Sequence, residues 1–288
     1  MNPAGRGRQG STQRWLPAVL LLVSAAAPSF GGPTAATPPP AFGPAGPAEA
    51  ASAFEALDQF RNPGQSSPYY LEFELLEMPR RGAGQTFQGR LWGSRTGEGA
   101  VLRIEVRDGG GGVRRFLLQN GPHAEAWSFR GGALSRLGPG ELGLPLVEGV
   151  EVTPFDLQMP YLYWPDVSVV SVTRVLGRPV DEFLFRGADG AGVRAYLDTQ
   201  FRALVKTELV DSSGAVLKTL SLVDLKKVGK QWIPRQVDVR TESTRSKTRI
   251  DFTAAALGLD LSPALFLPEA LGEEVAGPTE GRMERFPR

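Results

Sequence analysis

The stretch Ala100-Val-Leu-Arg-Ile-Glu-Val-Arg107 decides the fold class of this chain. Its apolar residues Leu102, Ile104 and Val106 fall at every second position, with charged residues between them. Because successive side chains of a β-strand point to opposite faces, this pattern predicts a strand with one apolar and one charged face. Asp108 and four glycines follow, and they predict a turn into the next strand rather than a phosphate-binding loop.

Segments of the same kind recur at intervals of roughly ten residues along the chain. They cover residues 69–78, 85–92, 100–107, 113–119, 122–129, 167–176, 180–186, 192–198, 203–211, 216–227, 236–241 and 248–253. This spacing favours a large antiparallel sheet or barrel of about 10–11 strands over alternating βαβ units. So large a sheet must curl, and its concave apolar face then needs a cover.

Two segments with helical features are available as that cover. Residues 49–61 predict an amphipathic N-terminal helix with Phe54, Leu57 and Phe60 on one stripe. The second segment is Thr153-Pro-Phe-Asp-Leu-Gln-Met-Pro-Tyr-Leu-Tyr-Trp164, where Thr153 is a helix-capping residue followed by proline. Pro160 lies too far inside for an undisturbed helix, so we expect one or two kinked turns. We therefore predict a short helical lid over the concave face.

The two ends of the chain are expected to lie outside this domain, which we place at residues 49–270. Residues 1–27 are predicted to be a signal peptide, because three arginines precede an apolar core at residues 15–23 and small residues up to Ala27 suit cleavage. An uncleaved N-terminal anchor is the alternative. Residues 28–48 are predicted to be a disordered linker rich in proline and alanine. Pro263-Ala-Leu-Phe-Leu-Pro268 should dock on the sheet edge, and residues 271–288 should form a flexible tail.

Composition excludes several classes of function. The 32 basic and 31 acidic side chains give a formal charge of +1 without a basic face for nucleic acid. The chain has no cysteine, so it can form no disulfide, no thiolate metal site and no lipid-modified cysteine. We expect no cofactor, no metal and no enzymatic activity. Asp156 and Asp166 are better explained as a helix cap and a turn residue than as a catalytic pair, and His123 has no companion ligand.

Four segments resemble the LolA/LolB-like superfamily, in the branch described as outer-membrane lipoprotein-sorting proteins. They are Phe155-Asp-Leu157 with Leu162-Tyr-Trp164, residues 193–210, residues 222–236 with their Trp-Ile-Pro turn, and residues 259–267. The resemblance covers roughly residues 50–268, and the absence of cysteine disfavours the lipid-anchored receptor branch. It implies a mainly β (α+β) fold, in which a half-open barrel is covered by helices and holds acyl chains or another apolar ligand.

The sequence and this resemblance predict an exported periplasmic carrier or chaperone for lipoprotein acyl chains or other lipid, acting without catalysis. The candidate lid or cavity residues are Phe155, Leu157, Met159, Tyr161, Leu162 and Trp164. We expect a monomer that meets a membrane-associated delivery partner in outer-membrane biogenesis. The alternative is a non-enzymatic envelope sensor or scaffold that recognises a protein partner.

Overall fold

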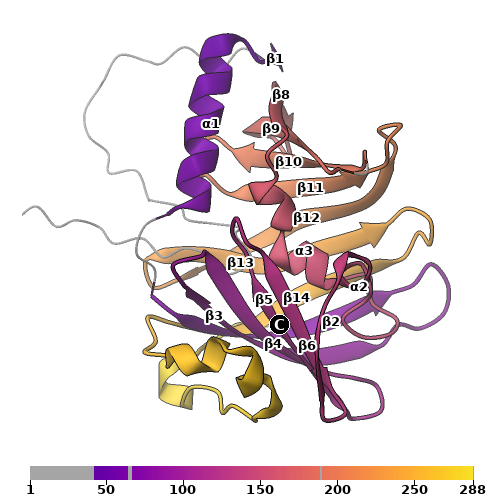
Figure 1. Cartoon of the computed structure of the whole chain (residues 1–288), viewed down its shortest axis with the longest axis vertical. Helices are drawn as coiled ribbons and strands as arrows, with labels where there is room; N and C mark the ends of the chain where they lie inside the picture. Colours follow the sequence, from indigo (N-terminus) through magenta and orange to yellow (C-terminus); the bar gives the residue numbers. More distant parts are fainter. Residues whose placement is uncertain (1–41, 64–66, 189, 288) are drawn as a thin grey trace, which may run out of the picture.

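One antiparallel sheet of 15 strands organises the described part of the chain (Figure 1). The computed structural model describes residues 42–63, 67–188 and 190–287. The strands are β1 (Gly43–Pro44), β2 (Tyr69–Met78), β3 (Thr86–Arg95), β4 (Ala100–Arg107), β5 (Val113–Gln119), β6 (Glu125–Arg130), β7 (Ala133–Arg136), β8 (Val167–Val175), β9 (Arg178–Arg186), β10 (Gly192–Asp198), β11 (Leu204–Val210), β12 (Val216–Val228), β13 (Gln231–Thr241), β14 (Lys247–Leu257) and β15 (Glu284–Arg285). The predicted signal peptide and residues 28–41 of the predicted linker lie outside the described residues.

The sheet consists of two meanders that meet along one strand pair. Strands β2 to β7 form the first meander and β8 to β14 the second, and β14 pairs antiparallel with β2 to join them. The sheet does not close into a barrel, because its path ends at β1 on one side and at β7 on the other. The prediction of a single, curved and open antiparallel sheet is therefore confirmed. The short strands β1, β7 and β15 lie outside every predicted segment.

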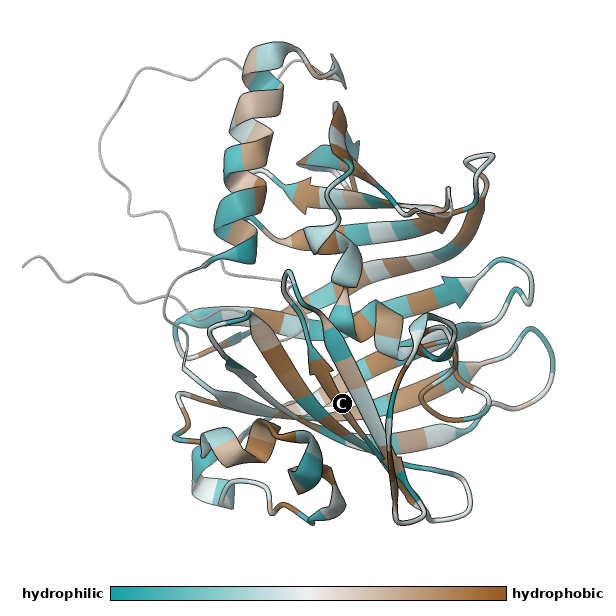
Figure 2. Cartoon of the chain, viewed as in Figure 1, coloured by the Kyte–Doolittle hydropathy of each residue, from teal (hydrophilic) through white to brown (hydrophobic). Residues whose placement is uncertain are grey.

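The inner face of the sheet, which faces the lid, carries the main hydrophobic core. Apolar and polar bands alternate along the strands, as the sequence predicts (Figure 2). Phe73 on β2 packs edge to face on Phe252 of β14, with ring centres 6.1 Å apart. Gly89, the partner of Phe73 on β3, must be glycine because a Cβ there would overlap the phenylalanine ring. The missing side chain thus makes room for a large aromatic residue on the neighbouring strand.

Helix α1 (Pro47–Arg61) packs beside the second meander, and it begins two residues before the predicted helix. Ala53, Leu57 and Phe60 are buried, whereas Phe54 stays 39% exposed while its ring meets Phe183 at 6.2 Å. Residues 42–48 were expected to be linker, and here the structure differs. Gly43 and Pro44 form β1 against β8, and the helix starts at Pro47, a residue that suits the first helical turn.

The C-terminal segment covers the outer face of the first meander. The 3-10 helices η2 (Pro263–Phe266) and η3 (Pro268–Gly272) lie over β4 to β7, so the expected docking of residues 263–268 on the sheet edge is wrong. Phe266 and Leu271 pack with Tyr70 and Trp92 in a second core on this face. The sequence analysis did not predict this core. Tyr70 of β2 and Trp92 of β3 lie on the face that the alternating pattern assigns to polar residues.

The predicted flexible tail is folded against the sheet. It contains η4 (Glu280–Arg282) and β15, which pairs with Ala254 and Ala255 of β14. Phe286 is 6% exposed and belongs to the main core, and its amide donates to the Thr253 carbonyl at 2.8 Å. Burial of one large ring and the pairing of β15 with β14 explain why this segment has a fixed place.

Candidate functional site

The predicted lid forms two short helices in the crossover between the meanders. They are α3 (Pro154–Gln158) and the 3-10 helix η1 (Pro160–Tyr163). The Thr153 hydroxyl accepts from the Asp156 amide at 3.3 Å, and the Asp156 carboxylate accepts from the Thr153 amide and hydroxyl, each at 2.8 Å. This is a reciprocal capping box, so the predicted helix start and the capping role of Asp156 are confirmed.

Met159 separates the two helices. Its φ of 52° lies in the left-handed region, which ends α3 and lets Pro160 begin the next turn. The predicted kink is therefore present. Met159 and Leu162, on either side of the kink, are each only 1% exposed.

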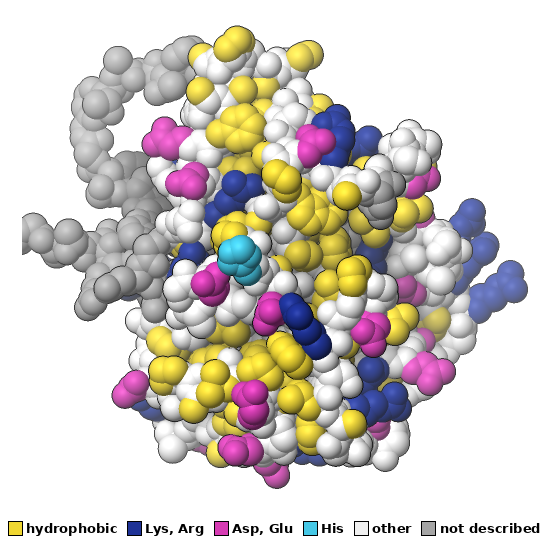
Figure 3. All heavy atoms as spheres, viewed as in Figure 1, with side chains coloured by type: hydrophobic (Ala, Val, Ile, Leu, Met, Phe, Trp, Pro, Cys, Tyr) yellow, Lys and Arg dark blue, Asp and Glu magenta, His cyan; other side chains and the backbone are white. Residues whose placement is uncertain are grey.

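The six candidate residues all lie at the inner face. Leu157, Met159, Tyr161 and Leu162 are buried in the same core as both meanders, whereas Phe155 and Trp164 are half-buried at its margin. The lid is therefore seated on the sheet in this structure, with its apolar side chains directed into the concavity. Figure 3 shows hydrophobic side chains reaching the surface around this region.

A continuous set of aromatic contacts joins the lid to the second meander and to α1. Tyr161 packs on Phe155 at 5.8 Å, on Trp164 at 6.4 Å and on Phe185 of β9 at 5.7 Å. Phe185 then stacks on Phe183 at 6.1 Å, and Phe183 is the ring that Phe54 of α1 meets. Because two of these rings are half-buried, the aromatic set reaches from the molecular surface to the interior.

Polar bonds hold the lid to both meanders. On the side of the first meander, the Gln158 amide group donates to the carbonyls of Gln119 and Glu125, each at 2.9 Å. Asn120 donates to the Met159 carbonyl at 3.3 Å. On the side of the second meander, the Lys218 ammonium on β12 pairs with the Asp156 carboxylate at 2.6 Å.

These polar partners were not predicted from the sequence. Burial raises the pKa of the Tyr161 hydroxyl well above the ordinary value. A lysine on a long strand and glutamine in a five-residue helix carry no sequence signal of their own. Their role depends on contacts between residues 33 to 62 positions apart in the chain.

The catalytic and metal arrangements considered from the sequence are not assembled. Asp156 serves the cap and Lys218, while Asp166 is 61% exposed and pairs with Arg186 at 3.5 Å. His123 is exposed in the β5–β6 connection. Among the described residues no group of three potential metal-binding side chains occurs, and no helix is long and apolar enough to cross a membrane.

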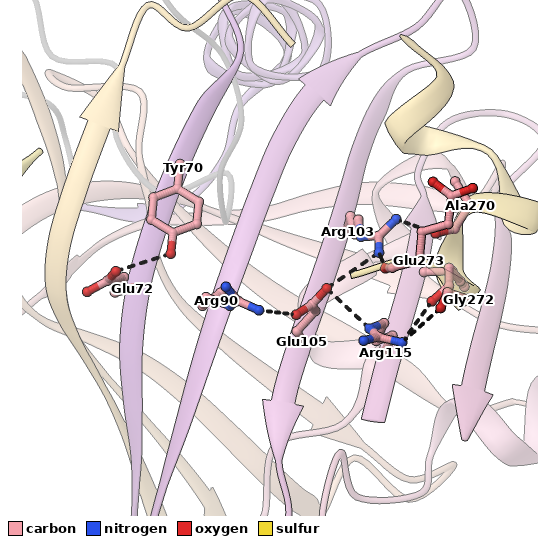
Figure 4. A network of polar contacts seen from close by, with 10 residues as sticks. Tyr70, Glu72, Arg90, Arg103, Glu105, Arg115, Ala270, Gly272 and Glu273 are labelled. Atoms are coloured by element: carbon pink, nitrogen blue, oxygen red, sulfur yellow. Dashed lines mark hydrogen bonds and ion pairs between the residues drawn. The ribbon is translucent and has the colours of Figure 1, made fainter. Parts of the chain in front are cut away.

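A hollow of about 480 Å³ lies on the outer face beside the C-terminal segment. Its walls include Glu72, Arg90, Glu105 and Arg285, so they carry charges of both signs. In its wall, Glu105 is 3% exposed and pairs with Arg90 at 2.6 Å and with Arg115 at 3.2 Å (Figure 4). The arrangement is not that of an apolar ligand cavity.

Arginines of the same network hold the C-terminal segment in place. Arg103, fully buried, donates to the carbonyls of Ala270 at 2.7 Å and Glu273 at 2.5 Å, and Arg115 donates to that of Gly272 at 3.4 Å (Figure 4). Each guanidinium thus satisfies backbone acceptors that the outer face would otherwise bury unpaired. We assign this region a structural role.

Comparisons with known proteins place the fold. The chain resembles the putative outer-membrane lipoprotein-sorting protein domain from Vibrio parahaemolyticus, with a TM-score of 0.65 and 17% identity over 75% of this chain and 97% of that one. It resembles a DUF1329 family protein from Desulfovibrio piger, with a TM-score of 0.64 and 15% identity over 77% and 98% of the two chains. A LolA superfamily protein from Nitrosomonas europaea gives a TM-score of 0.58 and 15% identity over 77% and 99%.

The chain thus forms an open, curved antiparallel sheet with a lid in the connection between its two meanders. The particular fold is that of the LolA-like superfamily, which confirms the resemblance inferred from the sequence. A family model described only as an uncharacterized protein matches residues 191–273. No curated protein sequence matches the chain significantly.

Proposed function

We propose that this protein is an exported periplasmic carrier or chaperone that binds acyl chains of lipoproteins or other lipid at its inner face, without catalysis. The observation that carries the proposal is the construction of the lid. Its buried apolar side chains belong to the core that both meanders share, yet only a few hydrogen bonds and one ion pair join it to the two meanders. A segment of this kind can leave the inner face as a unit and expose an apolar surface.

Burial of acyl chains supplies enough free energy for such a carrier. Each methylene transferred from water contributes about 0.8 kcal/mol, so one long chain can replace the contacts that the lid loses when it opens. The fold supports the same reading, because a solved structure with this fold is described as a lipoprotein-sorting domain. The predicted signal peptide supports export to the periplasm, where a membrane-associated partner would receive the ligand.

Purification of the exported protein from its native envelope tests the carrier function. Mass spectrometry of the intact protein should find co-purifying acyl species that organic solvent removes. A stoichiometric protein partner, with no acyl species recovered, would favour the alternative function of an envelope sensor or scaffold and would contradict the carrier proposal.

The variant Leu162→Glu tests whether the lid contributes to the ligand site. Leu162 is 1% exposed, and a carboxylate at this position would have to be buried against acyl chains in the loaded protein. We expect the neutral apolar dye N-phenyl-1-naphthylamine to bind about tenfold more weakly or worse, while the β signal in circular dichroism remains.

Leu144→Glu is the matched control. Leu144 precedes the lid and is 58% exposed, so the same chemical change there should leave dye binding as it is in the wild-type protein. Equal dye affinity in Leu162→Glu and Leu144→Glu would show that the lid does not line the ligand site.

A further inference from the structure

The side chain of Arg61 lies where α1, the lid and the second meander meet. It is in the last turn of α1, and its guanidinium packs over the ring of Tyr163 in the lid at 5.6 Å and over that of Phe185 at 6.0 Å. The Tyr163 hydroxyl donates to the Arg61 carbonyl at 3.3 Å, which joins the lid to the end of the helix. Arg61 therefore stands at the junction of the two covers of the inner face.

A second arginine reaches the same point from the first meander. Arg95, at the end of β3, donates to the Arg61 carbonyl at 3.0 Å and to the Asn62 side chain at 3.1 Å. Part of its role is to satisfy a carbonyl at the helix C-terminus, where positive charge is favourable. The result is that guanidinium groups from α1 and β3 converge beside the lid.

Neither guanidinium has a carboxylate partner within ion-pair distance among the residues that the structure describes. The nearby Asp58 carboxylate accepts instead from the Asn62 amide group at 3.2 Å. The Arg61 Nε is buried and donates to no acceptor, and burial lowers the pKa of this guanidinium from its ordinary value. A buried donor without an acceptor costs free energy unless a ligand supplies one.

Apolar side chains lie on either side of the Arg61 guanidinium. Figure 3 shows basic atoms at the foot of α1 between two groups of hydrophobic side chains, on the face that also shows the surface around the lid. A ligand that enters between α1 and the lid would place its apolar part on the aromatic set of Tyr161, Phe185 and Phe183. Its polar end would then remain beside Arg61.

We propose that Arg61, supported by Arg95, binds the anionic headgroup of the ligand, a phosphate or carboxylate attached to an acyl chain. This inference rests on the proposed function and narrows it to anionic amphiphiles rather than neutral ones. Guanidinium groups suit such headgroups because they offer several donors in one plane and stay charged at neutral pH. The headgroup supplies an acceptor for the buried Arg61 Nε.

A displacement assay on the exported protein tests the proposal. In it, amphiphiles compete with a bound neutral dye. N-phenyl-1-naphthylamine is displaced in low salt by dodecyl phosphate, dodecanol or dodecylamine, which share one chain length. We expect dodecyl phosphate to displace the dye at about a tenfold lower concentration than dodecanol, the usual size of a charge-assisted hydrogen bond. Inorganic phosphate alone should not displace it.

Arg61→Met should abolish the preference for dodecyl phosphate and leave displacement by dodecanol intact, because methionine keeps the apolar stem. Arg114→Met is the matched control, since Arg114 packs over Phe116 at the same 5.6 Å and lies at the end of β5 opposite to Gln119, the residue that bonds to the lid. It should keep the preference. If Arg61→Met fails to fold, Arg95→Met replaces it and should weaken the preference.

The outcomes separate this inference from the proposed function. A preference for dodecyl phosphate that survives in Arg61→Met, or that is lost equally in Arg114→Met, would overturn the headgroup assignment alone. So would equal displacement by dodecanol and dodecyl phosphate in the wild-type protein. Displacement by none of the amphiphiles would overturn the proposed function together with it.

Discussion

Asp181 lies on the inner face of β9 without a hydrogen-bonding partner in the described part of the chain. It is 8% exposed and precedes Phe183 by two positions, so its side chain shares the face of the aromatic wall. Burial raises the pKa of its carboxyl group from 3.8 to about 6. The folded protein therefore binds this proton more tightly than the unfolded chain does.

The sign of the effect on stability follows from linkage. Between pH 4 and 6 the folded state holds more protons at Asp181 than the unfolded state, so the free energy of unfolding falls as the pH rises through this window. Asp181→Asn removes this penalty. We expect the variant to exceed the wild type in the free energy of unfolding by about 2 kcal/mol at pH 7.5 and by much less at pH 4, as measured by urea unfolding.

Glu182→Gln is the control, because Glu182 is the next residue and points to the outer face. Its carboxylate accepts from Ser171 at 2.6 Å and Tyr196 at 3.4 Å, so its removal should not stabilise the protein at pH 7.5. A constant difference between Asp181→Asn and the wild type across this pH range would show that the carboxyl group titrates normally.

The role of a residue could be predicted from the sequence where its partners lie close to it in the chain. Thr153 and Asp156 were recognised as a cap because both partners lie within one turn of helix. The lack of a partner at Asp181, and the buried Nε of Arg61, depend on what other elements bring near them. The sequence of β9 shows that residue 181 is polar, but it gives no reason to expect that its charge is buried.

At the scale of elements, Lys218 of β12 and Asp156 of α3 form the one ion pair that joins the lid to the sheet among the described residues. The side chains are 13% and 8% exposed, so the pair is shielded from solvent screening. Lys218→Met removes the cation and keeps most of the apolar stem. We expect a loss of about 2 kcal/mol in unfolding free energy, and faster hydrogen exchange of the lid amides at residues 155–164.

Lys247→Met separates an effect on the lid from a general loss of stability. Lys247 pairs with Asp238 at 3.0 Å on the β13–β14 hairpin, and Arg249 keeps that carboxylate satisfied at 2.7 Å. Lid exchange should match the wild type in this control. Equal exchange of the lid amides in Lys218→Met and Lys247→Met would mean that the ion pair does not keep the lid closed.

The prediction of elements was successful for strands and wrong where one strand contains a proline. Residues 231–234 were expected to precede a separate strand, but β13 runs from Gln231 to Thr241 through Pro234. Pro234 is tolerated because β13 pairs with β14 only from Gln236 onward, so no neighbour on that side needs its missing N–H. Which part of a strand is locally an edge depends on pairing that the sequence does not reveal.

At the scale of the whole molecule, β13 and β14 separate beyond their short ladder, and the end of the chain fills the gap. Since β2 pairs with the other side of β14, β15 lies on the side that β13 has left. Arg235 on β13 completes the closure by donating to the carbonyls of Phe252 at 2.5 Å and Pro287 at 3.2 Å. The fold of the tail was not predicted because its composition favours disorder and its partners on β14 lie about thirty residues away in the chain.

Phe286→Ala tests whether the chain end is part of the cooperative fold. Phe286 contacts the main core and packs under Arg235, whose guanidinium lies 5.7 Å from its ring. Truncation of a buried phenylalanine should lower the free energy of unfolding by about 3 kcal/mol, seen as a lower urea midpoint. Leu267→Ala is the control, since Leu267 is 52% exposed in the same C-terminal segment and should change the midpoint little. A wild-type midpoint for Phe286→Ala would show that the gap between β13 and β14 closes without the tail, and that the sheet alone determines the stability of the protein.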